Sequence, residues 1–170
     1  MAGMKEGLAA LALATAAGCY NEARVAATSP VSQKEQPIET SAALGYEVGG
    51  KSGKNRVAFF VEYHESHSEE PPATIDTPTV TMGAVWRRHL TGERAELYGA
   101  LEAFNMTEFP HVQIGEPFNV DDHPDPVNTQ GLGFGLGVEL GRADIRLMYR
   151  RLLGSENIEG IVHSSVAFTF

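Results

Sequence analysis

The chain has 170 residues, 42% of them hydrophobic and 21% charged, which suits a single folded domain rather than a disordered segment. Its formal net charge of −9 disfavours nucleic acid as a partner, because a nucleic-acid surface needs clustered lysine and arginine against phosphate. The single cysteine, Cys19, excludes an intrachain disulfide.

Residues 1–18 are predicted to be a secretory signal peptide. Lys5 gives a weakly charged start, and an apolar run over residues 8–17 precedes small residues before Cys19. That run is too short to span a bilayer as a helix, so it indicates export. Cleavage could follow the small residues of the run, or fall before Cys19. The stretch "TAAGC" resembles a bacterial lipobox, although Ala16 stands where leucine is usual, so lipidation of Cys19 and a discarded or unpaired cysteine both stay open.

The N-terminal segment 19–40 contains the weakest predicted strand. Around "EARVAATS", residues 22–29, Ala23, Val25 and Ala27 alternate with Arg24 and its neighbours. A strand is needed here because seven clearer strands follow, whereas single-chain bacterial barrels have an even number. The rival segment "HVQIGEPFNV", residues 111–120, is predicted to be part of a loop, since a strand there would disturb the rhythm of the hairpins.

From residue 41 to residue 170, apolar residues alternate with polar or small ones in segments of about 9 to 13 residues, the length of a tilted membrane-spanning strand. Short turns such as "KSGKN" and "GRA" alternate with long polar loops. This rhythm predicts an all-β fold, an antiparallel up-and-down transmembrane β-barrel of about eight strands. The segments are "AALGYEVGG", "RVAFFVEYHES", "TVTMGAVWRRHL", "RAELYGALEAFNM", "GLGFGLGVELG", "DIRLMYRRLL" and "IVHSSVAFTF".

The stretch "GLGFGLGVELG" separates its two faces most sharply. Leu132, Phe134 and Leu136 fall on one side of an extended chain, and glycines with Glu139 fall on the other. We expect the leucines to face lipid and the glycines to leave room inside the barrel for long arginine side chains.

Residues 41–170 resemble the small outer-membrane β-barrel family of Gram-negative bacteria. The resemblance rests on "GLGFGLGVELG", "AELYGALEA", "DIRLMYRRL" and the final "SVAFTF". Val166, Phe168 and Phe170 are similar to the C-terminal signal that the barrel assembly machinery reads. The resemblance implies a location in the outer membrane, with that membrane's lipids and the assembly machinery as partners.

The face opposite the lipid is rich in charge. An eight-stranded barrel is nearly filled by side chains, and buried charges must be paired, so we expect an internal network and a plugged polar lumen. A narrow ion or proton path is the alternative. The residues of the predicted network are Glu47, Glu62, Glu96, Glu102, Glu139, Arg87, Arg146 and Arg150.

No catalytic residue, cofactor or metal site is predicted. His163 and Ser165 share the inward face of the last strand, which invites comparison with lipid A deacylase barrels, but the asparagine expected after the serine is absent. The segments "HESHSEE" and "DDHPDP" could gather a divalent cation, yet their spacing is nonspecific and solvated acidic loops are the favoured interpretation.

The predicted function is therefore structural: an outer-membrane barrel that anchors, stabilises the envelope or displays surface loops. An alternative from another class is a soluble or lipid-anchored periplasmic barrel that binds an apolar ligand. That alternative needs the faces reversed, with Leu132, Phe134 and Leu136 pointing inward. A lipid A-modifying enzyme is a minor alternative.

Overall fold

The computed structural model describes residues 19–32, 41–70, 73–90, 95–115, 120–154 and 158–170, and the predicted signal peptide, residues 1–18, lies outside them. The described residues form ten β-strands. No helix among them is long and apolar enough to cross a membrane. The strands are β1 (Cys19–Ser32), β2 (Ser41–Ser52), β3 (Asn55–Glu70), β4 (Ala73–His89), β5 (Glu96–Glu108), β6 (His111–Ile114), β7 (Val120–Asp122), β8 (Val127–Leu140), β9 (Ala143–Leu153) and β10 (Ile158–Thr169).

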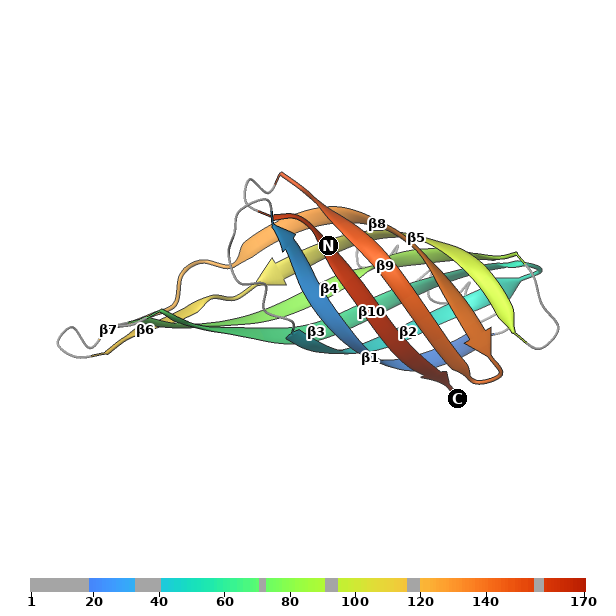
Figure 1. The fold of residues 1–170 in the computed structure, drawn as a ribbon, viewed down its shortest axis with the longest axis horizontal. Helices are drawn as coiled ribbons and strands as arrows, with labels where there is room; N and C mark the ends of the chain where they lie inside the picture. The colour runs from blue at the N-terminus through green and yellow to red at the C-terminus, as the bar shows by residue number, and fades with distance from the viewer. Residues whose placement is uncertain (1–18, 33–40, 71–72, 91–94, 116–119, 155–157) are drawn as a thin grey trace, which may run out of the picture.

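Eight of these strands close into an antiparallel barrel (Figure 1). β1, β2, β3 and β4 each pair with the strand that follows, β5 pairs with β8, β8 with β9, and β9 with β10. Pairing of β1 with β10 closes the wall, for example at Val25↔Val166. The predicted all-β, up-and-down barrel of eight strands is confirmed, and β1 supplies the eighth strand, around the segment 22–29.

The segment 111–120, expected to be loop, instead contributes β6 and the start of β7. The physical reason is an open strand edge. β5 stops pairing with β4 at Glu108↔Thr79, whereas β4 continues to Ala73, and β6 takes up the vacated edge over Ala73–Asp76. Unpaired edge groups favour the addition of a strand. The end of β3, the start of β4 and the hairpin of β6 and β7 therefore extend beyond the barrel wall (Figure 1).

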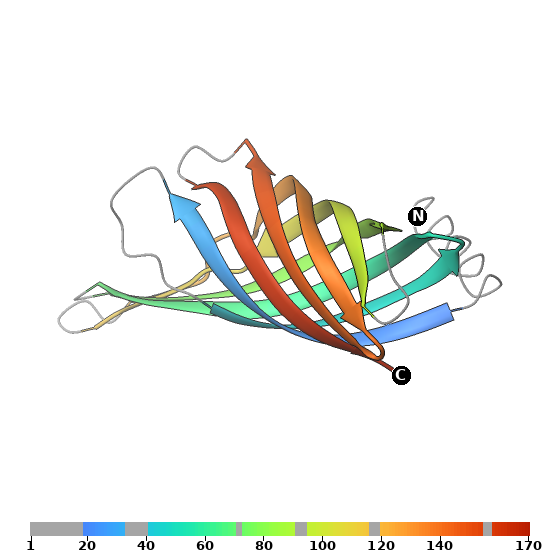
Figure 2. The same cartoon turned by 45° about the vertical axis from the view of Figure 1, so that its right-hand side comes forward.

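The strand ends joined by the short turns, here called the short-turn end, lie opposite the strand ends joined by the other connections, the long-connection end (Figure 2). Gly53 and Gly141 adopt φ of 58° and 65° in the β2–β3 and β8–β9 turns, a conformation that glycine permits without strain. The pairs Cys19↔Gly50 and Glu22↔Thr169 put the start of β1 and the end of β10 at the same short-turn end.

Every wall strand presents apolar side chains outward. Leu132, Phe134 and Leu136 of β8 are 54%, 59% and 59% exposed, and Leu44 of β2 and Leu147 of β9 are exposed as well. The reversed arrangement, with these leucines lining a ligand-binding lumen, is therefore wrong. Side chains alternate between the two faces of a strand, so the charged residues must point inward where the leucines point outward.

The inward glycines of β8 make room mainly for aromatic and thioether side chains, not for arginines as expected. A Cβ atom at Gly137 would lie 2.2 Å from the Tyr98 ring, and one at Gly131 would lie 2.2 Å from the Phe104 ring. Among the glycines of β8, the nearest contacts include an arginine side chain at Gly133, whose added Cβ would lie 3.3 Å from the Arg150 Cγ. Because these glycines lack side chains, large residues of the neighbouring strands β5 and β9 can pack directly against β8.

Candidate functional site in the barrel lumen

The interior of the barrel is lined by charged side chains from seven of its eight wall strands, and β10 adds His163 and Ser165. Seven of the eight predicted network residues are buried there, and Glu96 is half-exposed at the short-turn rim. On β1 and β9 an inward carboxylate is followed by an inward arginine two residues later, Glu22 by Arg24 and Asp144 by Arg146, since every second residue points inward. Buried charged residues that the sequence analysis did not include in the network are Glu22, Arg24 and Asp144.

Arg87 and Arg146 form the centre of this network. Arg87 donates two hydrogen bonds to Glu22, with Nη1–Oε1 and Nη2–Oε2 distances of 3.2 and 2.8 Å, and also contacts Glu47. Arg146 donates to Glu47 Oε2 from both terminal nitrogens, at 3.3 and 3.2 Å, and to Asp144 at 3.1 Å. Charge-assisted, paired contacts of this kind offset the desolvation of buried charges.

Two buried tyrosines complete the central cluster. Tyr20 donates its hydroxyl proton to Glu47 Oε1 at 2.8 Å. Tyr98 donates to Asp144 at 2.6 Å and accepts a hydrogen bond from Arg146 Nε at 3.0 Å. The Tyr98 hydroxyl thereby satisfies two charged neighbours at once, which fixes the ring beneath β8 and explains why Gly137 lies opposite it.

A second cluster surrounds Glu62, nearer the long-connection end. Arg150 donates to Glu62 at 2.6 Å and to Glu102 at 2.8 Å. Arg24 donates to the other Glu62 oxygen at 3.0 Å, and His163 Nε2 lies 3.2 Å from that oxygen. Because Arg24 also contacts Glu47, it joins this cluster to the central one.

A third group lies at the short-turn end. Arg56 forms an ion pair with Glu139, and Glu96 lies between His89 Nδ1, at 2.7 Å, and Lys51 Nζ, at 3.8 Å. His89, Glu96 and Glu139 have the donor atoms of a metal site. However, Lys51 and Arg56 already neutralise the two carboxylates, so a cation would have to compete with fixed positive charge.

The predicted site residues outside the network occupy distinct places. Val166, Phe168 and Phe170 are exposed on the outer face at 41%, 58% and 70%. Cys19 begins β1, and its acylation stays a prediction. The alternation of apolar and polar residues along β1 and β9 indicates that Glu22, Arg24 and Asp144 point inward. For Glu22 and Arg24 this indication was weak, because "EARVAATS" has the poorest alternation of the predicted strands.

His163 and Ser165 both lie buried inside the barrel, so the pair does not face lipid. Residues 67–70, the second half of "HESHSEE", also differ from expectation, because they continue β3, paired with the start of β4 as far as Glu70↔Ala73, where a loop was expected. A polar strand can continue past the apolar band because its backbone ladder is satisfied by its neighbour.

Solved structures with the same fold are outer-membrane barrels. Neisserial surface protein A aligns with a TM-score of 0.57 and 14% identity over 91% of this chain and 98% of its own. The attachment invasion locus protein Ail of Yersinia pestis gives 0.61 and 13% over 91% and 99%. The N-terminal barrel domain of Pseudomonas aeruginosa OprF gives 0.50 and 14% over 89% and 99%.

A scan of protein-family models finds no match for the chain, and neither does a search of curated proteins. At identities of 13% and 14%, the structural likeness concerns the fold. Closed antiparallel pairing, eight wall strands, apolar side chains outside and charged side chains inside are all found together in this chain. The protein therefore has the fold of the small eight-stranded outer-membrane β-barrels.

Proposed function

We propose that this protein resides in the outer membrane of a Gram-negative bacterium as a barrel with a plugged polar lumen, acting as an envelope anchor and as a scaffold for its surface loops. The observation that carries the proposal is the inversion of its faces: apolar side chains cover the outer wall, while arginines and carboxylates are buried within. In water this arrangement would leave a large apolar surface exposed, whereas lipid covers it.

The outer wall supports lipid as its surroundings. An open apolar groove runs over Leu101, Phe134 and Leu147, with almost no polar atoms along it. Closed pairing satisfies the backbone groups of the wall, which lipid could not hydrogen-bond. The long connections would then face the outside of the cell, with the β3–β4 and β6–β7 strands extending away from the membrane surface.

The filling of the lumen supports a plug in preference to an ion path. The charged clusters connect through Arg24 and Glu47, and Phe60, Phe104 and Met148 occupy part of the remaining interior. Side chains held by two or more ion pairs resist the displacement that a conducting path requires. This role needs no cofactor and no catalytic chemistry.

Lipids of the outer membrane and the barrel assembly machinery are the proposed partners. Val166 and Phe168 are exposed on the outer face of β10, and Phe170 is exposed directly after its end, where an assembly factor could reach all three. If Cys19 is acylated, its lipid would sit at the short-turn end and add a second anchor to the barrel.

The test begins with the membrane fraction. We expect the protein to run at different positions in SDS gels with and without boiling, because a closed barrel resists the detergent until it is heated. Recovery from the soluble fraction with a single mobility would contradict the membrane location.

The plug is tested separately, in planar bilayers. The reconstituted protein should show no steady conductance, and a Glu47→Ala/Arg146→Ala variant should conduct more than the wild type, because it removes the centre of the network. Steady ion conductance by the wild-type barrel would contradict the plug and leave the membrane location intact.

A further inference from the structure

The β6–β7 hairpin brings His111 and His123, which lie on opposite sides of its turn in the sequence, into contact with each other. β7 pairs with β6 in antiparallel register, Val112↔Asp122 and Gln113↔Asp121. His111 precedes the first of these pairs and His123 follows it, so the two histidines face each other at the base of the hairpin. Residues opposite one another, or two apart along a strand, share a face of the sheet, which adds Asp121 to the same face.

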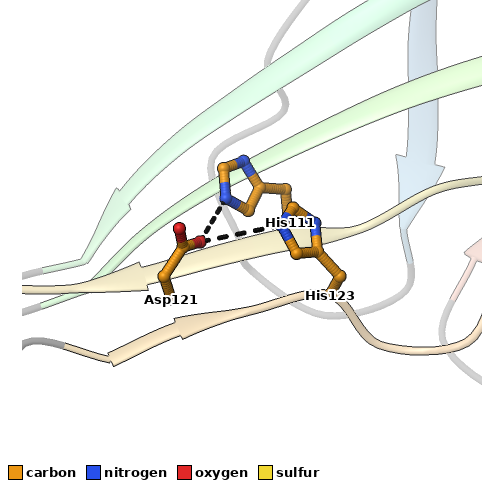
Figure 3. A group of neighbouring side chains, drawn as sticks. All are labelled: His111, Asp121 and His123. Carbon is orange, nitrogen blue, oxygen red and sulfur yellow. Dashed lines mark hydrogen bonds and ion pairs between the residues drawn. The ribbon is translucent and has the colours of Figure 1, made fainter.

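The three side chains converge on one carboxylate oxygen (Figure 3). Asp121 Oδ1 lies 2.6 Å from His111 Nε2 and 3.8 Å from His123 Nε2. The imidazole rings are stacked, with centroids 4.3 Å apart and planes within 9° of parallel. Both Nε2 atoms are thus turned toward the same oxygen, and one ligand atom from each residue lies within 4.8 Å of the other two.

We propose that His111, Asp121 and His123 form a binding site for a zinc ion. Zinc takes imidazole nitrogen and carboxylate oxygen at about 2.0 to 2.2 Å in a tetrahedral shell, so two of its ligand atoms lie about 3.4 Å apart. The His111 and Asp121 atoms, 2.6 Å apart, would have to separate slightly, and atoms near the 4.8 Å limit would have to close by about an ångström, which side-chain rotation on an exposed hairpin provides. Three protein ligands leave a fourth position for water or an incoming group.

The chemistry of the donors selects the metal. Two imidazoles and one carboxylate suit zinc and similar transition metals, whereas calcium and magnesium prefer an all-oxygen shell. On binding, the Nε2 proton that His111 donates to Asp121 moves to Nδ1 by way of solvent, which frees the Nε2 lone pair for the ion, and the same carboxylate changes from hydrogen-bond acceptor to ligand.

The charge around the hairpin distinguishes it from the lumen group of His89, Glu96 and Glu139. At the lumen group, lysine and arginine occupy the carboxylates. At the hairpin, no lysine or arginine of the described chain forms an ion pair with Asp121. Asp121 and His123 are also well exposed, so an ion can reach them without opening the barrel.

The test uses the full, untagged chain refolded in uncharged detergent micelles and titrated with zinc chloride against a fluorescent chelator. We expect one zinc ion per chain. Asp121→Asn and the double variant His111→Ala/His123→Ala should each weaken binding by about tenfold or more, because each removes direct ligands. Excess calcium should not displace the zinc.

The matched control is Asp122→Asn, which removes the same charge from the same strand but from its opposite face. It should keep zinc affinity within about twofold of the wild type. All variants should keep the heat-dependent gel mobility, since the hairpin lies outside the barrel wall. Equal zinc binding by wild type and double variant, equal losses at Asp121 and Asp122, or displacement by calcium would each overturn the proposal.

Discussion

Replacing Leu136 by arginine tests the orientation of the barrel wall most directly. The Leu136 side chain is 59% exposed on the outer face of β8, four residues before the strand ends at Leu140. At about 3.3 Å per residue and a tilt of about 40°, Leu136 lies roughly 10 Å above the short-turn rim. This is close to the middle of an apolar band about 25 Å tall.

An arginine near the middle of the bilayer costs about 2 to 4 kcal/mol, and one near the interface costs about 0 to 1 kcal/mol. Leu140→Arg is therefore the matched control, because Leu140 lies on the same face of the same strand and is 47% exposed. A difference of about 2 to 3 kcal/mol between the variants corresponds to a change of roughly 30- to 150-fold in the folding equilibrium constant.

The assay is urea unfolding of each variant in lipid vesicles, followed by the fraction that migrates as folded barrel in an unboiled gel. Leu136→Arg should unfold at clearly lower urea than Leu140→Arg, and the latter should stay near the wild type. If the two variants unfold together, depth in lipid does not govern the cost, and the assignment of this face to the membrane is wrong.

Three further changes, two substitutions and one deletion, probe the lumen, the glycines and the chain terminus. Arg87→Met removes both arginine hydrogen bonds to the buried Glu22 carboxylate and should lower the free energy of unfolding by about 3 to 5 kcal/mol, whereas the exposed neighbour change Arg88→Met should have little effect. Gly137→Ala adds a Cβ 2.2 Å from a buried tyrosine ring and should destabilise the barrel by about 1 to 3 kcal/mol, whereas Gly99→Ala meets nothing within 4 Å. Deleting Phe170 should slow assembly in pulse-chase gels, whereas the Phe170→Trp variant, which keeps a terminal aromatic residue, should assemble at the wild-type rate.

Each of these comparisons has a contradicting outcome. Equal urea midpoints for Arg87→Met and Arg88→Met would show that the lumen network adds nothing to stability. Equal midpoints for Gly137→Ala and Gly99→Ala would show that the interior beside Tyr98 has room for an added methyl group. Unchanged assembly of the truncated chain would remove the terminal phenylalanine from the proposed signal.

The sequence alone predicted the class of fold and which residues share a face, and it favoured the outward orientation of the apolar face that the structure confirms. Leu132, Phe134 and Leu136 alternate with glycine, and a strand has a period of two, so a single assignment of the apolar face orients the whole strand. The short and long connections determined which strands form hairpins. Local information is enough here because both features depend on neighbours in the chain.

The sequence was less informative where a strand is short or polar. "EARVAATS" alternates poorly because small alanines fill both faces, yet β1 closes the barrel through its pairing with β2 and β10. β6 exists because β4 outlasts β5 and offers an open edge. The length of a neighbouring strand is not encoded in the segment that pairs with it.

Only the tertiary structure decided which charges meet. Glu22 contacts Arg87, and Arg146 contacts Glu47, although these pairs are 65 and 99 residues apart in the chain. The same holds at the hairpin, where the pairing of β6 and β7 places His111 beside His123. Alternation tells a side chain which face to take, but its partner across a barrel depends on the stagger and closure of all eight strands together.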